Sequence, residues 1–300
     1  MRLFWIALHC VYFVFAICPQ SAFAQGSLEQ FERVATGKIK SPALQELSGM
    51  VASRVNKNCF WVHNDSGDDA KIYLIDSTAK LLCTYNLQGV SAVDFEEIAW
   101  FEKDGKHYLI VGDIGDNRAK RKHIKFHIFP EPTWKAGKSE RDIVDIVSIS
   151  AIYPDGARDA EAFFVDPLTK QLILVSKRDF QAQVYTTNIL ANANFASNNT
   201  DKPLMLKFET KLPLTFITAA DISADGHHIL VKNLTNIYYW KRATNSLVAS
   251  LKKAYEEIPY KPEPQGEAIT FSVDGETFYT ISERPLGLES YLYRYQFLNK

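Results

Sequence analysis

Glu97-Ile-Ala-Trp-Phe-Glu-Lys-Asp-Gly-Lys-His-Tyr-Leu-Ile-Val-Gly-Asp113 is the stretch that decides the fold, because it holds two apolar runs around an Asp-Gly turn and a carboxylate at each end. Apolar runs of this length that flank such a turn predict a β-hairpin. The same spacing of sixteen positions recurs in three further hairpin-like segments, between Gly49 and Asp65, Glu161 and Lys177, and Glu267 and Glu283. A unit that recurs with polar groups at fixed places indicates a repeat fold.

A fifth copy of this unit is shorter. It runs from Thr218 to Asn233, and we align Asp221 with the first carboxylate of the other copies. A third strand-like run follows each hairpin, and four copies supply a fourth, such as Leu81–Leu87 and Ile143–Ile149. Four-stranded units arranged radially describe a β-propeller.

The ends of the copies predict the number of blades and the closure of the ring. Five copies predict an all-β propeller of five four-stranded blades, and a sixth blade between Glu97 and Glu161 is the alternative. The last copy ends after its third run, Tyr291–Phe297, so its fourth strand must come from elsewhere. We expect Phe31–Ile39 to pair with this last blade and close the ring.

The beginning of the chain differs from the rest. Arg2 precedes an apolar stretch from Leu3 to Cys18, and Ala22-Phe-Ala24 has the small residues of a cleavage site. This pattern predicts a secretory signal peptide over residues 1–24, followed by one propeller domain over residues 25–300. A retained membrane anchor is the alternative, although the apolar stretch is short for a span. We therefore expect a secreted or periplasmic protein without a stable membrane span after cleavage.

Charge and cysteine content limit the partners and the covalent links. The formal net charge is -1 and no basic stripe is present, which argues against nucleic-acid binding. Cys59 and Cys83 are the two cysteines beyond the signal peptide. The expected strand order places them two strands apart, about 9.6 Å, which exceeds the roughly 7 Å limit between the Cα atoms of a disulfide. We predict no disulfide.

Polar residues of the five copies should meet at one end of the central channel, because the first strand of each blade lines the channel and the hairpin returns the second strand to the same face. Five carboxylates are the metal candidates: Glu97, Asp113, Glu161, Asp221 and Glu267. The polar residues around them are the ligand-binding candidates: Asn64, Asp65, Asp116, Asn117, Lys177, Arg178, Lys232 and Arg284.

Converging carboxylates repel each other unless a cation lies among them. Oxygen ligands without clustered histidine or cysteine suit a hard cation, and Ca²⁺ is the first candidate in a secreted protein. The alternative is structural: the carboxylates accept hydrogen bonds from the backbone of neighbouring blades and pair with lysine and arginine. Both interpretations remain open from the sequence.

Evidence for catalysis is thin. Glu97, Glu161 and His63 are candidate proton-transfer groups because they fall at the ends of channel strands. A histidine at a strand end also serves as a hydrogen-bonded structural group. The sequence contains no nucleophile elbow, phosphate-binding loop or dinucleotide fingerprint, so we expect no nucleotide or organic cofactor.

Several motifs, including Trp61-Val-His-Asn-Asp-Ser-Gly-Asp68, Asp94-Phe-Glu-Glu-Ile-Ala99 and Asp159-Ala-Glu-Ala162, resemble those of a family of secreted bacterial β-propeller proteins of unassigned function. The acidic first strands are more distantly similar to SdiA-regulated propellers, esterase-like phytases and the gluconolactonase and paraoxonase group. In that last group, a Glu, Asn and Asp set holds a Ca²⁺ that polarises an ester or lactone carbonyl. The resemblance implies a calcium site here, but this chain is richer in carboxylates and adds lysines.

Two functions of different class follow as expectations. In the first, the acidic channel mouth binds a cation and a small polar or anionic ligand without chemistry. In the second, the protein is a Ca²⁺-assisted hydrolase of an ester, lactone or phosphoester, in which the metal is the Lewis acid and a carboxylate the base. The sequence favours binding, leaves enzymatic activity undecided and names no protein partner.

Overall fold

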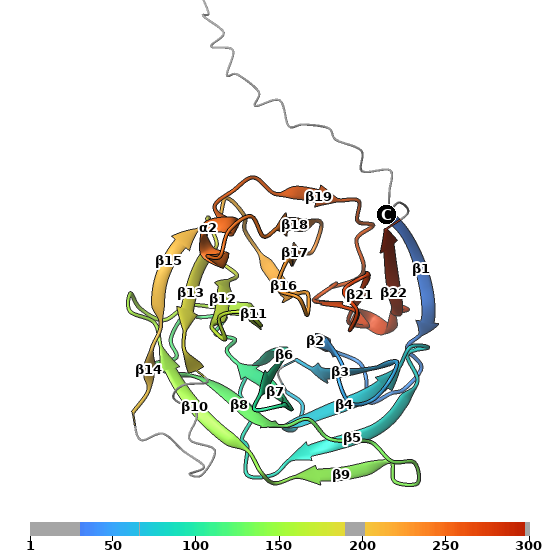
Figure 1. Ribbon diagram of the computed structural model, residues 1–300. Helices are drawn as coiled ribbons and strands as arrows, with labels where there is room; N and C mark the ends of the chain where they lie inside the picture. Colours follow the sequence, from blue (N-terminus) through green and yellow to red (C-terminus); the bar gives the residue numbers. More distant parts are fainter. Residues whose placement is uncertain (1–30, 66, 190–201, 298–300) are drawn as a thin grey trace, which may run out of the picture.

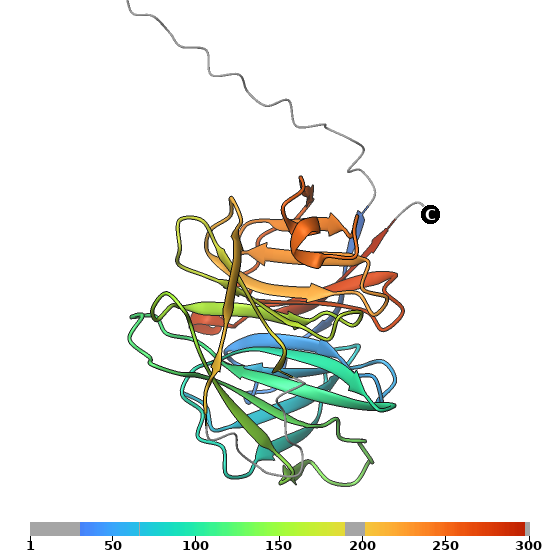
Figure 2. The same cartoon turned by 60° about the vertical axis from the view of Figure 1, so that its left-hand side comes forward.

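The structure is a computed structural model that describes residues 31–65, 67–189 and 202–297. Its strands form five twisted sheets around one axis, a five-bladed β-propeller (Figure 1). Figure 2 shows the same ring turned by 60°. The predicted signal peptide, residues 1–24, lies outside the described residues. Among the described residues, no helix is long and apolar enough to cross a membrane.

The blades are numbered here in chain order. Blade 1 holds β2 (Leu47–Ala52), β3 (Cys59–Asn64), β4 (Lys71–Asp76), β5 (Leu81–Leu87) and β9 (Glu140–Ile143). Blade 2 holds β6 (Phe95–Lys103), β7 (Lys106–Asp113), β8 (Ile124–Pro130), β10 (Val147–Ile152) and β14 (Leu204–Met205). Blade 3 holds β11 (Ala160–Val165), β12 (Leu172–Ser176), β13 (Gln183–Thr187) and β15 (Lys207–Lys211). Blade 4 holds β16 (Ile217–Ile222), β17 (His228–Asn233), β18 (Ile237–Lys241) and β19 (Glu256–Ile258).

Blade 5 closes the ring. It holds β20 (Ala268–Phe271), β21 (Thr277–Ile281), β22 (Tyr291–Phe297) and β1 (Phe31–Lys38). The pairing of β1 with β22 is antiparallel, so the predicted closure of the ring is confirmed. Two short helical segments, α2 (Leu247–Leu251) and η1 (Pro285–Gly287), lie in loops of blades 4 and 5.

The five inner strands, β2, β6, β11, β16 and β20, each contact the inner strands of both neighbouring blades and surround the channel. The predicted five blades are therefore confirmed, and the alternative of a sixth is wrong. The long stretch between Glu97 and Glu161 instead supplies β9, which pairs in parallel with β5 of blade 1. The predicted fourth strand of blade 2, Ile143–Ile149, is wrong in its bounds. The chain leaves blade 1 after Ile143 and enters blade 2 at Val147.

Five clusters of buried apolar side chains hold the ring together, one at each seam between neighbouring blades. Between blades 1 and 2, for example, Trp61 and Leu74 pack with Ile98 and Leu109. Side chains alternate between the two faces of a strand. Each blade can therefore present one apolar face to each of its two neighbours. Cys59 and Cys83 lie on β3 and β5, with β4 between them, and both are buried free thiols.

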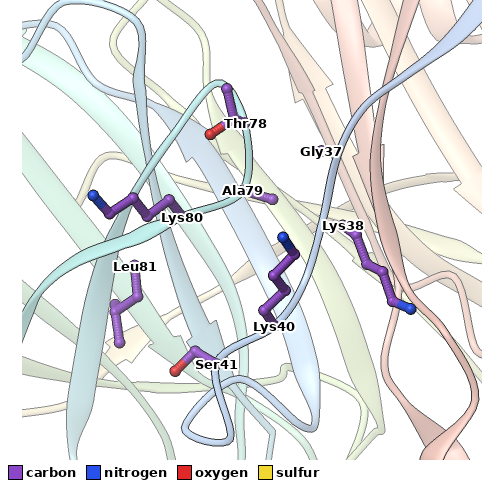
Figure 3. A pocket seen from close by; sticks show the side chains of 8 residues that line it. All are labelled: Gly37, Lys38, Lys40, Ser41, Thr78, Ala79, Lys80 and Leu81. Carbon is purple, nitrogen blue, oxygen red and sulfur yellow. The ribbon is translucent and has the colours of Figure 1, made fainter.

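Gly37 allows β1 to pass close to the turn between β4 and β5 at the seam of blades 5 and 1. A Cβ atom at Gly37 would lie 1.9 Å from the carbonyl oxygen of Thr78. Figure 3 shows Gly37 beside this turn and Thr78 on it. Backbone cannot rotate away as a side chain can, so one strand has to shift.

Gly37→Ala should therefore destabilise the protein by about 1–3 kcal/mol, the usual cost of forcing extra atoms into a packed site. Urea unfolding followed by circular dichroism measures the change. Gly89→Ala is the matched control, because a Cβ atom added at Gly89 would have no atom within 4 Å. The positive φ of Gly89 adds some backbone strain to this control. Equal midpoints for Gly37→Ala and the unaltered protein would contradict the close approach.

Candidate functional site

A register irregularity at the start of the inner strand places one side chain per blade at the channel mouth, the end at which the inner strands begin. In blade 3 the pairing skips Glu161, and in blade 2 it skips Glu96. The skipped residues in blades 1 and 4 are Ser48 and Thr218. Such bulges redirect a side chain away from the regular alternation. Glu267 occupies the corresponding place before β20 in blade 5.

The spacing of sixteen residues relates equivalent positions in only two of the four predicted pairs, Glu161 with Lys177 and Glu267 with Glu283. The hairpins of blades 1 and 2 are one and two residues longer than that of blade 3. Their mouth positions are consequently Ser48 and Glu96 instead of Gly49 and Glu97. The alignment of Asp221 is also wrong, because Thr218 is the bulged residue of blade 4.

Seven carboxylates form a continuous arc across the mouth. Three overlapping groups have ligand atoms within 4.8 Å of one another: Asp65, Glu267 and Glu283; Asp65, Asp94 and Glu96; and Glu96, Asp159 and Glu161. Asp65 and Glu96 each belong to two groups. This acidic arc runs across four consecutive blades, 5, 1, 2 and 3. Each of these blades contributes at least one of the carboxylates.

Two cations pair with the acidic arc. The Lys177 ammonium donates to Glu161 Oε1 and lies 3.8 Å from Glu267 Oε1, so it joins the two ends of the arc. Arg178 Nε lies 2.5 Å from Asp159 Oδ2. Among the described residues, two ion-paired cations and the nearby Lys232 stand against seven carboxylates, so the mouth is acidic when every carboxylate is ionised.

This imbalance shifts the protonation of the arc. Burial, with the neighbouring charges of Asp65 and Asp94, holds the pKa of Glu96 well above its usual range. Burial and the charge of Asp65 raise the pKa of Asp94 to about 6. Burial and the charge of Glu267 raise the pKa of Glu283 to about 8. Part of the arc therefore carries protons near neutral pH unless another cation neutralises it.

Glu161 keeps one unpaired oxygen inside the arc, among the described residues. The residue is only 3% exposed. Its Oε1 accepts from Lys177, but its buried Oε2 has no hydrogen-bond partner among the described residues. A buried carboxylate oxygen without a donor is costly, and this oxygen belongs to the group it forms with Glu96 and Asp159. A cation among these three residues would satisfy it.

A hollow of about 440 Å³ adjoins the arc between blades 5 and 1. Asp65 and Glu283 line it, together with Gln45, Gln265 and Arg284. The backbone N–H of Arg284 donates to Gln45 O. Among the described residues, no carboxylate lies within 4.0 Å of its guanidinium nitrogens. We call this space the mouth hollow. It offers amide, carboxylate and guanidinium groups to a small polar ligand.

The structure does not bring the five metal candidates together. Glu161 and Glu267 belong to the acidic arc, whereas Glu97 and Asp221 lie deeper in the channel. Glu97 accepts from the N–H of Ile98 at 3.1 Å and of Ala220 at 3.4 Å, across the channel on β16. Asp221 accepts from Thr270 Oγ1 and from Phe271 N on β20. These two carboxylates link inner strands: Asp221 links the neighbouring blades 4 and 5, and Glu97 reaches across the channel from blade 2 to blade 4.

Asp113, the fifth metal candidate, is paired with Arg121 at 2.8 Å and accepts from Asp94 N. His63 is fully buried with Nδ1 2.9 Å from Asn64 O, and burial lowers its pKa. A fully buried imidazole that is bonded to a neighbouring backbone oxygen fits a structural role. Glu161 is therefore the one proton-transfer candidate that the structure places in the mouth.

The remaining ligand-binding candidates divide between the mouth and the loops. Lys177 and Asp65 lie in the acidic arc, and Arg284 lines the mouth hollow. The other five have structural partners: Asn64 donates to Ala43 O, Asp116 accepts from Arg121 N, Asn117 accepts from Arg178, Arg178 pairs with Asp159, and Lys232 donates to Gly266 O. Burial lowers the pKa of Lys232 to about 8.

Four residues of the acidic arc are absent from the sequence-based candidates: Asp94, Glu96, Asp159 and Glu283, of which only Glu283 appeared in the pairs of the sixteen-residue spacing. A signal for the other three exists. Asp94-Phe-Glu96 and Asp159-Ala-Glu161 share the pattern Asp-x-Glu, and Gln265-Gly-Glu267 is its amide variant. Aligning the copies on this pattern gives the mouth positions directly, whereas alignment on a fixed spacing does not.

A larger hollow, of about 770 Å³, lies away from the mouth on the outer rim, where Lys38, Lys40 and Lys80 line it. Their ammonium groups point in different directions (Figure 3), and Lys38 pairs with Glu289. It therefore lacks convergent polar groups. Comparison with protein-family models and with curated proteins finds no match for the chain.

Proposed function

We propose that this propeller binds a hard divalent cation, with Ca²⁺ as the first choice, in the acidic arc of its channel mouth, and a small polar or anionic ligand beside it. The observation that carries the proposal is the arc itself: seven carboxylates in overlapping groups, with the unpartnered Oε2 of Glu161 among them. Carboxylate oxygens without sulfur or imidazole ligands suit Ca²⁺.

Glu96, Asp159 and Glu161 are the first residues we assign to the cation. Glu96 and Glu161 are 2% and 3% exposed, so an ion between them would be largely screened from water. Lys177 now supplies the positive charge at this end of the arc. A divalent cation would displace its ammonium group from Glu161, so Lys177 competes with the metal.

The mouth hollow is the place we assign to the second ligand. Asp65 and Glu283 belong both to the hollow and to the acidic arc, so a ligand there would lie beside the cation. Arg284 would bind an anionic group, and Gln45 and Gln265 would bind hydroxyl or carbonyl groups. This set favours a sugar, phosphoester or cell-envelope fragment over an apolar compound.

The hydrolase remains the second proposal because of one feature. Glu283 lines the hollow and belongs to the acidic arc, so with a cation bound it would lie as an ionised carboxylate beside the ligand and could take a proton from an attacking water. The distant similarity to Ca²⁺-dependent lactonases points the same way. Binding stays the first proposal because the sequence contains no nucleophile elbow.

Calorimetric titration with Ca²⁺ tests the proposal. We expect binding to the unaltered protein and a loss of about ten- to a hundredfold in affinity for Glu161→Gln, because ligand charge sets Ca²⁺ affinity. Lys177→Met should bind about tenfold more tightly, equivalent to about 1.4 kcal/mol. Glu102→Gln, at the exposed far end of β6, is the matched control.

Absence of Ca²⁺ and Mg²⁺ binding by the unaltered protein would reject the cation site. Turnover of a lactone and of p-nitrophenyl phosphate, each with and without chelator, separates the two proposals. Chelator-sensitive turnover that Glu283→Gln abolishes would establish the hydrolase. Cation binding without turnover would support the binding function.

A further inference from the structure

A second cavity lies at the opposite end of the propeller from the mouth, at the seam of blades 5 and 1. It has a volume of about 610 Å³, within the usual range for small-ligand sites. Its walls come from the tips of the β2–β3 and β20–β21 hairpins and from β22. We call it the seam cavity. None of its lining residues belongs to the acidic arc or the mouth hollow.

The seam cavity is positively charged. Arg54, Lys57 and Arg294 line it, and Asp274 is the one carboxylate on its wall. Among the described residues, no carboxylate lies within 4.0 Å of the charged nitrogens of the three cations. This concentration of charge contrasts with the net charge of -1 of the whole chain.

Arg54 is fixed by two contacts and still has unpaired hydrogen-bond donors. Its guanidinium lies 3.8 Å from the centre of the Trp100 ring, and Nη1 donates to Val273 O at 3.2 Å. Its Nε and Nη2 are buried and have no acceptor among the described residues. The nearest carboxylates are committed elsewhere, since Asp221 accepts from β20 and Glu131 accepts from Ser53 and Trp61.

Arg294 is the second guanidinium of the seam cavity. It projects from β22 next to Tyr279, and its buried Nε also lacks an acceptor among the described residues. Both guanidinium groups of the cavity keep a buried donor that has no acceptor among the described residues, and each such donor is costly. An anion between them would remove both costs, and arginine binds carboxylates through two parallel hydrogen bonds.

The other walls are apolar. Phe60 and Tyr279 pack with their ring centres 4.6 Å apart across the seam, and both line the cavity with Val55 and Val273. Val55 and Val273 are 38% and 49% exposed, so apolar surface remains for a ligand to cover. A bare inorganic anion would leave these side chains in water.

We propose that the seam cavity binds an organic carboxylate, with the carboxyl group between Arg54 and Arg294 and an aromatic or aliphatic body against Phe60, Tyr279 and the two valines. A free small acid and the carboxyl end of a peptide share this chemistry. The site is independent of the acidic mouth and requires no divalent cation.

Titration of the full chain with phenylacetate, in the presence of chelator, tests the proposal by calorimetry and by the fluorescence change expected from Trp100 beneath Arg54. We expect a Kd of about 1 mM or tighter. Phenylacetamide, which lacks the charge, and acetate and inorganic phosphate, which lack the body, should each bind at least tenfold more weakly. A peptide ending in Phe with a free carboxyl group, compared with its amidated form, distinguishes a chain end from a free acid.

Arg294→Gln should weaken phenylacetate binding by about tenfold or more, as expected for loss of a charged hydrogen-bond donor. Arg54→Gln should weaken binding to the same extent, but it also removes the stacking on Trp100. If the Arg54 variant fails to fold, the Arg294 variant still tests the site. Arg118→Gln, an exposed arginine on a mouth loop, is the control and should bind normally. The proposal is overturned if phenylacetate does not bind, if Arg294→Gln binds equally well, or if phosphate binds as tightly.

Discussion

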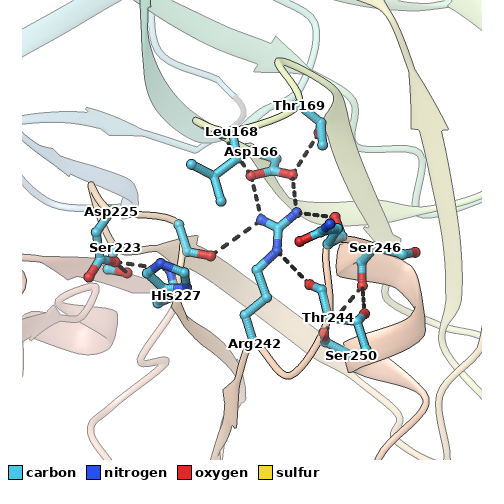
Figure 4. Close-up of polar contacts among 12 residues, drawn as sticks. Asp166, Leu168, Thr169, Ser223, Asp225, His227, Arg242, Thr244, Ser246 and Ser250 are labelled. Carbon is cyan, nitrogen blue, oxygen red and sulfur yellow. Dashed lines mark hydrogen bonds and ion pairs between the residues drawn. The ribbon is translucent and has the colours of Figure 1, made fainter.

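Asp166→Ala should destabilise the propeller by about 3–5 kcal/mol, the usual cost of removing one partner of a buried ion pair. Asp166 and Arg242 join blades 3 and 4 through two contacts of 2.8 and 3.0 Å, and their side chains are 0% and 1% exposed. Figure 4 shows the guanidinium facing both carboxylate oxygens. Arg242 also donates to three backbone carbonyls, of Gly226, Thr244 and Asn245. Without Asp166, its charge stays buried and unbalanced.

Urea unfolding measures this effect, and two further variants interpret it. Adding Arg242→Met to Asp166→Ala should recover at least about 1 kcal/mol, because the buried charge is gone. Lys207→Ala removes an exposed ion pair with Glu209 and should cost less than about 1 kcal/mol. If Asp166→Ala costs no more than Lys207→Ala, the pair does not hold the seam.

Ca²⁺ should change the pH dependence of stability, because the acidic arc holds protons without it. The pKa of Asp94 is raised to about 6 and that of Glu283 to about 8, against about 4 in an unfolded chain. The folded protein therefore binds more protons than the unfolded chain between these values. Its stability falls as the pH rises from about 4 to about 8. Two groups act in the opposite direction: His63, whose pKa is lowered by burial from 6.5, in the acidic part of this range, and Lys232, whose pKa is lowered to about 8, above it.

Saturating Ca²⁺ should remove this fall, because a cation keeps the carboxylates ionised without penalty. At a hundred times its Kd, the ion adds about 2.7 kcal/mol. This corresponds to a rise in Tm of about 5 °C or more for a domain of this size. Calorimetric scans at pH 5 and pH 8, with chelator and with Ca²⁺, measure both effects. Glu283→Gln should flatten the pH profile of the chelated protein, and a chelated protein more stable at pH 8 than at pH 5 would contradict the assignment.

Strand order followed from the sequence because it depends on local pattern. Each hairpin is fixed by an apolar run, a turn and a second run within about twenty residues, and five such units leave few ways to bury their faces. The closure by Phe31–Lys38 was also accessible, since the last copy lacked a strand. The sequence could not predict that Glu140–Ile143 crosses to the edge of blade 1. A short edge strand has no pattern that selects its partner, so it pairs wherever a neighbouring strand has a free edge.

The sequence by itself predicted a ring of five blades, with six as the alternative, and a mouth rich in carboxylates. Only the tertiary structure decided that Glu96, not Glu97, faces the mouth, because hairpins longer by one or two residues move the bulge, and a shift of one residue turns a strand side chain to the other face. It also decided which charges meet. Arg54 and Arg294 lie far apart in the chain and line one cavity only because the ring closes.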